Sequence, residues 1–362
     1  MTEMFTERRF VMKKASAALL CAALLLAGCS SSTTPDSSKE DKDQNKTNTA
    51  DTEKENTASE DKDGKALLQD LIDNASDDDK ALAAWNSLFA QTAKEYNYQF
   101  EVEGDGEDYL FKENEQESLV EDNITYEAGT KSWFLADEET LYALSLTDID
   151  DAYDNLEQGY GTLIYSASGD ESETVQVDLT DTENDTLKGT IKAIQPGKGM
   201  PMAVQAEDLI ANSLINYGYI RSVDPVHNAS LYDFSLDEKD GKYVLTINVK
   251  DIDALKKAST TSTLLEDNKT GAPVLALDEI TDEGFVITFS DKGVLSEAEN
   301  SISHAASALD RSVYLNIRNR VEYKKAKMDD LNTEEYSAFM TKILKGELKE
   351  GDSFEEKDWE KD

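Results

Sequence analysis

Cysteine and histidine are scarce in this sequence, with two of each among 362 residues. Both cysteines, Cys21 and Cys29, lie near the N-terminus, so the rest of the chain has no pair from which to build a disulfide framework. Zinc sites need several Cys or His ligands close together, and this sequence has too few of either to predict one. Stability must therefore come from an ordinary hydrophobic core, and the chain is long enough to bury one.

The common catalytic motifs are also missing. There is no Gly-x-Ser-x-Gly nucleophile elbow, no Gly-Lys-Ser/Thr phosphate loop and no dinucleotide-binding fingerprint. His227 follows Asp224-Pro225-Val226 and His304 takes a polar position in an alternating run, so both are expected in a turn or on the surface. We therefore predict no catalytic residue, no enzyme activity and no cofactor.

A carboxylate-dependent hydrolase is the least favoured alternative. A glycosidase would need two carboxylates about 5–10 Å apart on facing elements. Among 76 acidic residues the sequence does not single out such a pair.

Basic residues are few, since 36 Lys and Arg stand against 76 Asp and Glu and give a formal net charge of −40 at pH 7. A surface of this charge repels nucleic acid and anionic lipid, so no nucleic-acid partner is expected. It attracts divalent cations, but the acidic run at residues 148–154 lacks the glycine and the bidentate glutamate of a calcium-binding loop. No metal site is therefore predicted.

The N-terminus has the layout of a secretory signal peptide. Four basic residues between positions 8 and 14 precede an Ala- and Leu-rich run at residues 15–27, and small residues follow. The run has about thirteen residues, fewer than the roughly twenty that a membrane-spanning helix needs. Both Met1 and Met12 are suitable starts.

Leu26-Ala27-Gly28-Cys29 resembles the lipobox of bacterial lipoproteins. The resemblance implies that residues 1–28 are a signal peptide and that Cys29 becomes the diacylated first residue of the mature chain. It further implies attachment to the cell membrane through this lipid, on the extracytoplasmic side. The outer membrane is the alternative in a Gram-negative cell, because Ser30 is not an aspartate retention signal. An ordinary signal peptide that ends in cysteine is the other interpretation.

Residues 29–64 are predicted to form a disordered, acidic tether. No large apolar residue occurs between Ser30 and Gly64, and Ser, Thr, Asn, Asp, Glu and Lys dominate. Such a segment cannot bury enough apolar surface to offset the entropy of ordering. As a flexible coil it would span roughly 30–35 Å.

The body, residues 65–350, begins with helical patterns. Leu67, Leu68, Leu71 and Ile72 form a short apolar face, and apolar residues at spacings of three and four predict a helix over residues 77–95. Ser76 and Asp79 have the spacing of a capping box at its start. Within this helix Trp85 is predicted to be a core residue.

Alternation with a period of two then indicates an antiparallel meander. The turn signals between its strands include Gly104-Asp105-Gly106 and Asn184-Asp185. The predicted strands cover residues 98–102, 108–111, 118–126, 132–135, 140–146, 161–166, 173–179 and 186–194.

A Pro- and Gly-rich segment at residues 196–202 interrupts the strands, and the body is either one unit or two lobes divided there. A helix starting at Pro201 is expected next. Further strands are expected at residues 243–249, 285–289, 294–304 and 313–323, with turns at Asp240-Gly241 and at residues 291–293, a helix over 251–265, and a last helix from Asn332. Residues 351–362 form an acidic tail.

Runs of helices and strands in this order predict an α+β fold with a curved antiparallel sheet and flanking helices. The element order resembles the LolA/LppX-type lipid carriers, in which such a sheet wraps over helices. The resemblance implies a binding module for a lipid-like or other apolar small molecule. A structural lipoprotein that interacts with an envelope protein is the alternative.

Six basic residues lie close together in the otherwise acidic chain, between Arg311 and Lys327. On a strand, Arg318 and Arg320 point to the same face, opposite to Ile317. These two arginines are candidate ligand-binding residues for an anionic headgroup or an acidic partner. Internal charge compensation on a solvated face is the simpler interpretation.

Overall fold

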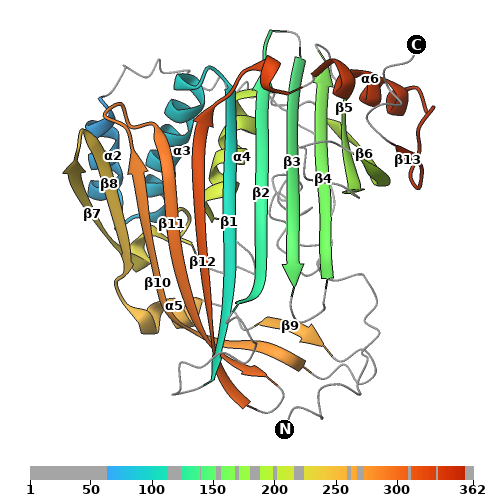
Figure 1. Cartoon of the computed structure of the whole chain (residues 1–362). Helices are drawn as coiled ribbons and strands as arrows, with labels where there is room; N and C mark the ends of the chain where they lie inside the picture. The colour runs from blue at the N-terminus through green and yellow to red at the C-terminus, as the bar shows by residue number, and fades with distance from the viewer. Residues whose placement is uncertain are drawn as a thin grey trace, which may run out of the picture.

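The computed structural model describes residues 63–112, 124–138, 140–151, 156–167, 171–179, 188–198, 202–215, 224–258, 262–266, 273–308, 311–331 and 333–354. Within these residues the chain forms a large, open and curved antiparallel sheet with five α-helices, which confirms the predicted α+β fold (Figure 1).

The first half of the sheet is a meander of six strands, each paired with the next along the chain. These strands are β1 (Gln99–Lys112), β2 (Ile124–Ala136), β3 (Thr140–Asp151), β4 (Leu156–Ala167), β5 (Glu171–Leu179) and β6 (Gly189–Lys198).

The second half is a meander of five strands. They are β7 (Tyr232–Lys239), β8 (Lys242–Val249), β10 (Pro273–Phe289), β11 (Leu295–Ala308) and β12 (Arg311–Lys325). The short strand β9 (Ser262–Glu266) pairs with β10 beside this path.

Pairing of β1 with β12 joins the two meanders into one continuous sheet, so the segments on either side of residues 196–202 do not form separate sheets. The strand order is β13-β6-β5-β4-β3-β2-β1-β12-β11-β10-β8-β7. The two-residue strand β13 (Ser353–Phe354) lies at the β6 edge and β7 lies at the opposite edge.

Helices lie on both faces of the sheet. The helices are α2 (Gly64–Asn74), α3 (Asp78–Glu95), α4 (Met202–Ile215), α5 (Ile252–Ala258) and α6 (Thr333–Leu344). Two short 3-10 helices, η2 (Ala229–Leu231) and η3 (Met328–Asp330), complete the described elements. No helix in the described part of the chain is long and apolar enough to span a membrane.

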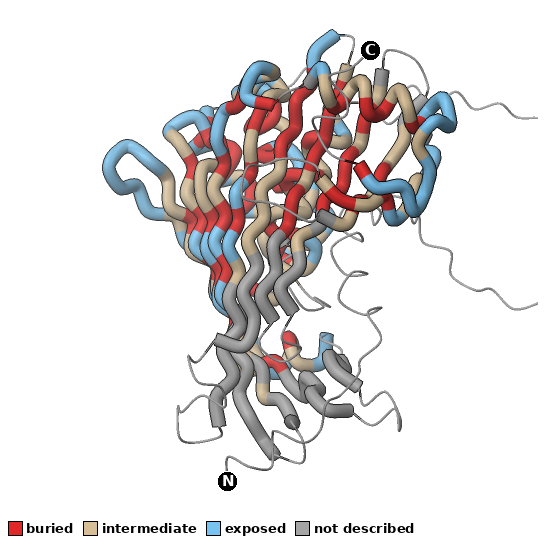
Figure 2. The backbone as a smooth tube through the Cα atoms, turned by 45° about the vertical axis from the view of Figure 1, so that its right-hand side comes forward, coloured by how far each residue is buried: buried red, intermediate tan, exposed pale blue. Residues whose placement is uncertain are grey.

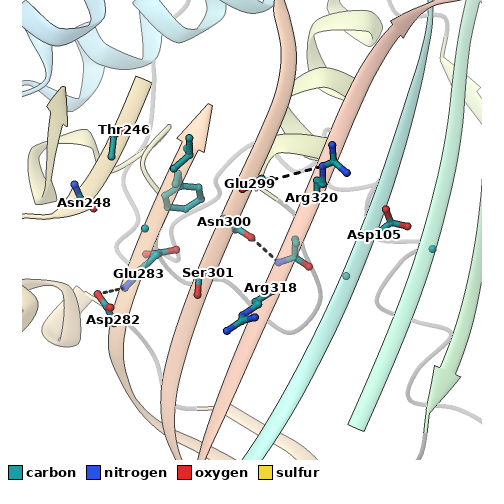
Figure 3. A pocket seen from close by; sticks show the side chains of 16 residues that line it. Asp105, Thr246, Asn248, Asp282, Glu283, Glu299, Asn300, Ser301, Arg318 and Arg320 are labelled. Carbon is teal, nitrogen blue, oxygen red and sulfur yellow. Dashed lines mark hydrogen bonds and ion pairs between the residues drawn. The ribbon is translucent and has the colours of Figure 1, made fainter. Parts of the chain in front are cut away.

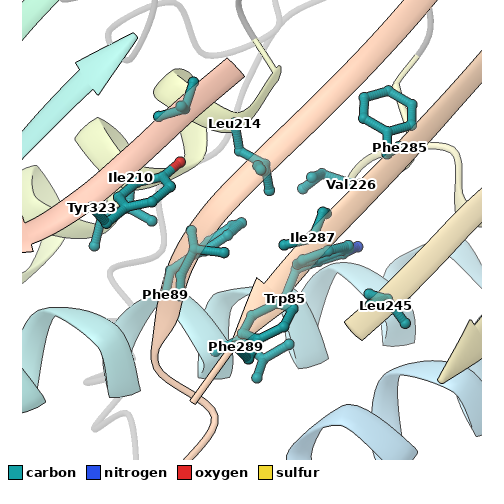
Figure 4. Close-up of a cluster of buried hydrophobic side chains, with 14 of the residues drawn as sticks. Trp85, Phe89, Ile210, Leu214, Val226, Leu245, Phe285, Ile287, Phe289 and Tyr323 are labelled. Atoms are coloured by element: carbon teal, nitrogen blue, oxygen red, sulfur yellow. The ribbon is translucent and has the colours of Figure 1, made fainter. Parts of the chain in front are cut away.

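The larger hydrophobic core lies between α2, α3 and α4 and the strands that they cover. Figure 4 shows Trp85 and Phe89 of α3 against Ile287 and Phe289 of β10. Trp85 is fully buried, as predicted, and its indole N–H donates a hydrogen bond to the carbonyl oxygen of Pro225 at 3.2 Å. This face of the sheet is called the helix-covered face below.

A second core lies on the opposite face, under α6. Alternation along β2 separates the two cores, since Phe134 belongs to the first whereas Trp133 and Leu135 belong to the second. Phe339 of α6 packs on Phe354 of β13 with ring centroids 4.8 Å apart. Figure 2 shows the resulting bands of buried residues across neighbouring strands. The core under α6 involves strands β2 to β6 and β13, whereas the described side chains on the part of this face from β8 to β1 are exposed or half-buried.

Two local predictions, a turn and a helix cap, are wrong. Gly104-Asp105-Gly106 is no turn, because β1 runs through it. A Cβ on Gly104 would lie 2.8 Å from Thr130 Oγ1, so this glycine permits close approach of β2. The cap of α3 is Asp77, whose carboxylate accepts the amide of Lys80, rather than Ser76.

The helix expected over residues 251–265 is wrong in its second half. It ends with α5 at Ala258, and β9 begins at Ser262. The boundary of the expected tether also moves, because Gly64 is the first residue of α2 and is buried. The strands predicted at 140–146, 161–166, 173–179 and 243–249 and the helix predicted at 77–95 are confirmed.

Candidate functional site

A groove of about 840 Å³ crosses the face of the sheet opposite to the helix-covered face (Figure 3). Six neighbouring strands contribute to it: β8, β10, β11, β12, β1 and β2. The residues that line it are Asp105, Gly106, Gly129, Thr246, Asn248, Asp282, Glu283, Gly284, Phe285, Val286, Glu299, Asn300, Ser301, Arg318, Asn319 and Arg320.

The strand register aligns the exposed and half-buried lining residues in two rows across the sheet. The first row runs Thr246, Val286, Glu299, Arg320, Asp105 and Gly129, each paired with the next. The second row runs Asn248, Gly284, Ser301 and Arg318. Successive residues of one face are two positions apart, so the two rows are adjacent. Both predicted arginines therefore lie in the groove, one in each row.

Glycine shapes the floor of the groove. A Cβ on Gly129 would meet no atom within 4 Å, and one on Gly284 would lie 3.7 Å from Asn248 Oδ1. Neither position has a positive φ angle. The two glycines thus leave space over the backbone that a side chain would fill.

Arg320, in the first row, is bound by three carboxylates, of which only that of Glu299 belongs to the same row. Its Nη2 atom lies 2.8 Å from an oxygen of Glu297 and 2.8 Å from an oxygen of Glu322, and its Nε atom lies 3.8 Å from Glu299. Hydrogen bonding to Glu297, together with the charges of the other carboxylates, raises the pKa of Arg320. Because these side chains are substantially exposed, the pairs fix geometry more than they add stability.

Lys324 lies four residues after Arg320 on β12 and bridges two acids. Its Nζ atom lies 2.6 Å from Glu103 and 3.1 Å from Glu322. Hydrogen bonding to Glu103, and next to Glu322, raises the pKa of Lys324. The hydrogen bond from Lys324 lowers the pKa of Glu103. The structure therefore shows internal charge compensation at Arg320 and Lys324, which was the simpler of the two interpretations.

A layer of buried polar side chains lies beneath the groove, on the helix-covered face of the same strands. The hydroxyl of Tyr232 donates to Glu283 at 2.6 Å, and Glu283 is only 2% exposed. The side-chain amide of Asn319 donates to Asn300 Oδ1 at 2.8 Å. Asn300 Nδ2 is buried without a hydrogen-bond partner among the atoms that the structure places. The first bond links β7 to β10 and the second links β12 to β11, so both connect strands of the sheet beneath the groove.

The histidines do not join the groove in the described part of the chain. His227 is exposed, as predicted, and its Nδ1 atom lies 3.1 Å from both carboxylate oxygens of Asp224. Hydrogen bonding to Asp224 raises the pKa of His227. His304 lies in β11, but its side chain is outside the described residues, as is that of Arg311. Cys29 also lies outside them.

Sequence reasoning did not select Asp105, Asn248, Asp282 or Ser301, which line the groove with the arginines. The Gly104-Asp105-Gly106 pattern predicts a turn at Asp105, and the others are polar residues on strands, where an exposed face is expected to be polar. No signal in the sequence marks them, because their shared location depends on pairings between distant strands.

The groove offers both hydrogen-bond donors and hydrogen-bond acceptors. No group of three or more His, Cys, Asp or Glu that could hold a metal ion occurs among the residues whose positions are described. No family model matches the sequence, and a search of curated proteins found no significant match. Function must therefore be argued from the residues themselves.

Proposed function

We propose that this chain is a lipid-anchored extracytoplasmic protein that binds a ligand in the groove and carries out no covalent chemistry. The observation that carries the proposal is the groove itself, where the register of six strands collects polar side chains around an open floor. Its volume of about 840 Å³ lies within the 300–1,000 Å³ that is typical of ligand sites.

The lipobox supports the anchored location. If Cys29 is the lipidation site, the mature N-terminal peptide of the wild-type protein carries a diacylglycerol adduct. Mass spectrometry of this peptide tests the point directly. Cys29→Ser should abolish acylation and leave an uncleaved precursor of higher mass, and a wild-type peptide that starts at Cys29 without the adduct would refute the anchor.

The groove supports a polar ligand better than the apolar one that element order implied. On the helix-covered face, side chains of α2, α3 and α4 pack against the strands and occupy the surface where an apolar ligand would lie. The exposed lining of the groove consists mainly of charged, amide and hydroxyl side chains. Binding of an apolar ligand stays a prediction, and no apolar groove among the described residues supports it.

The packing of helices on that face favours one second candidate, a structural lipoprotein that contacts another envelope protein. A sheet face filled by the protein's own helices is what a scaffold requires. The two candidates differ in one respect: the first retains a small ligand, whereas the second has none.

Native mass spectrometry of gently extracted protein separates the two candidates. Ser301 is exposed between Gly284 and Arg318 in the second row, so Ser301→Trp should block the groove. Ser87, exposed on α3, gives the matched control Ser87→Trp. We expect a co-purified ligand mass in the wild type and the control and its loss in Ser301→Trp. An unliganded mass in all three proteins would refute the binding module and favour the scaffold.

A further inference from the structure

We propose that the ligand of the groove is a neutral, hydroxyl-rich oligosaccharide that lies across the strands. This inference rests on the proposed binding function and adds the chemical class of the ligand. Four properties of the groove lead to it: its length, the donors and acceptors in it, its charge and its floor.

The length of the groove suits a chain-like ligand. It crosses six neighbouring strands, and a strand spacing of about 4.8 Å makes it roughly 24 Å long. A single metabolite would occupy a fraction of this length, whereas several linked sugar rings would fill it. The groove is open, so a polymer could enter from the side without threading.

The polar groups match a ligand whose groups both donate and accept hydrogen bonds. Arg318 can only donate hydrogen bonds, and the carboxylate of Asp105 can only accept them. A hydroxyl pairs with either kind of group, and two neighbouring hydroxyls match the paired oxygens of a carboxylate or the fork of a guanidinium. A ligand with donors alone or acceptors alone would leave one of these sets unpaired.

Charge disfavours the main competitors. The protein carries a formal net charge of −40, which opposes an anionic polymer. A basic peptide would be attracted to the molecule as a whole, but it would meet a guanidinium in each row of the groove. The acids around Arg320 are also already engaged with it. A neutral ligand avoids both conflicts.

The floor suits the flat faces of sugar rings. Gly129 and Gly284 carry no side chain that would hold a ring away from the backbone. The space above Gly129 is open, and a Cβ on Gly284 would only reach ordinary contact with Asn248 Oδ1 at 3.7 Å. Val286, which is 42% exposed in the first row, supplies an apolar surface for the C–H groups of a ring. Apolar contact from one face and hydrogen bonds at the ring edges are the two contributions that a sugar requires.

Isothermal titration with defined hexamers tests this ligand class. The neutral probes are maltohexaose, cellohexaose and N-acetylchitohexaose, the anionic probe is hexagalacturonate, and the basic probe is hexalysine. We expect at least one neutral hexamer to bind and to bind at least tenfold more tightly than its dimer. Ser301→Trp should weaken this binding at least tenfold and Arg318→Ala at least fivefold, while Ser87→Trp leaves it unchanged.

Melting curves of each variant confirm that it is folded, and Arg318→Ala decides the matter if Ser301→Trp does not fold. Failure of every neutral hexamer to bind refutes the oligosaccharide, and binding of hexalysine in its place assigns the groove to a basic peptide. Neither result tests whether the groove binds a ligand at all, which the native mass spectrometry described above decides. A ligand lost from Ser301→Trp in that measurement, without glycan binding, would overturn this inference alone.

Discussion

The contact between two glycines predicts a large difference between two similar substitutions. Gly293, in the turn between β10 and β11, and Gly241, in the turn between β7 and β8, both have a φ of +74°. A Cβ on Gly241 would meet no atom within 4 Å, whereas one on Gly293 would lie 2.8 Å from Gly64 Cα and 3.4 Å from Gly64 O. Gly241→Ala is therefore a matched control for Gly293→Ala, with the same backbone strain and no steric conflict.

The expected magnitudes follow from these two effects. A left-handed conformation costs an L-residue about 1–2 kcal/mol, which applies to both alanine variants. Overpacking against a neighbour adds roughly 1–3 kcal/mol, which applies only where the Cβ meets the backbone of α2. We therefore expect Gly241→Ala to lower the free energy of unfolding by about 1–2 kcal/mol and Gly293→Ala to lower it by about 2–5 kcal/mol.

Urea denaturation monitored by tryptophan fluorescence measures both values. Trp85, fully buried on α3, reports the loss of the helix-covered core. Equal losses for the two variants would refute the close packing of the start of α2 on the β10–β11 turn. A larger loss for Gly241→Ala would refute it as well.

Three further predictions concern the same helices. Thr92→Val should lower the free energy of unfolding by about 1–3 kcal/mol, because Thr92 Oγ1 accepts a hydrogen bond from the buried amide of Leu295 at 3.0 Å. Thr92→Ser keeps this hydrogen bond and serves as the control. Equal free energies of unfolding for the two variants in urea would contradict the role of the bond. A chain that starts at Asp63 should melt as the full chain does. A chain that starts at Gly64 lacks the N-cap of α2, so its free energy of unfolding should be lower by about 1 kcal/mol. Identical melting of the two truncated chains in a calorimeter would contradict a stabilising role of this cap. Burial raises the pKa of Tyr96 from 10.0 to about 12, so the contribution of its neutral phenol to stability is complete below pH 10 and is lost as the pH rises toward 12. The free energy of unfolding, measured by denaturation between pH 9 and 12, should therefore decline less steeply in Tyr96→Phe than in the wild type. An equally steep decline in the two proteins would contradict this prediction.

Local patterns predicted the elements whose neighbours are close in sequence. The spacing of apolar residues predicted α3, and strict alternation with the Asp240-Gly241 turn predicted β8 and its hairpin. In that hairpin both turn residues have positive φ angles, which is the conformation that this dipeptide favours. Such features depend on a few consecutive residues and can be read from them.

Contacts between distant segments were the part that could not be predicted. The Gly104-Asp105-Gly106 triplet has turn composition, but its conformation is decided by β2 and β12 on either side. The groove depends on the same pairings, since Asp105 and Arg320 meet only because β1 joins β12. The sequence placed Arg318 and Arg320 on one face, but it held no information on which acids surround them.

The β1–β12 pairing also sets when the sheet can be completed. Phe100 pairs with Lys325, more than 200 residues later in the chain. At the usual rate of synthesis this separation corresponds to roughly 10–40 s during which β1 lacks its second neighbour. Through that interval one edge of the first meander presents unpaired N–H and C=O groups, the kind of surface that another strand can join. The open edge of β1 is therefore the place where a chaperone, or a second unfinished copy, would pair with the growing chain.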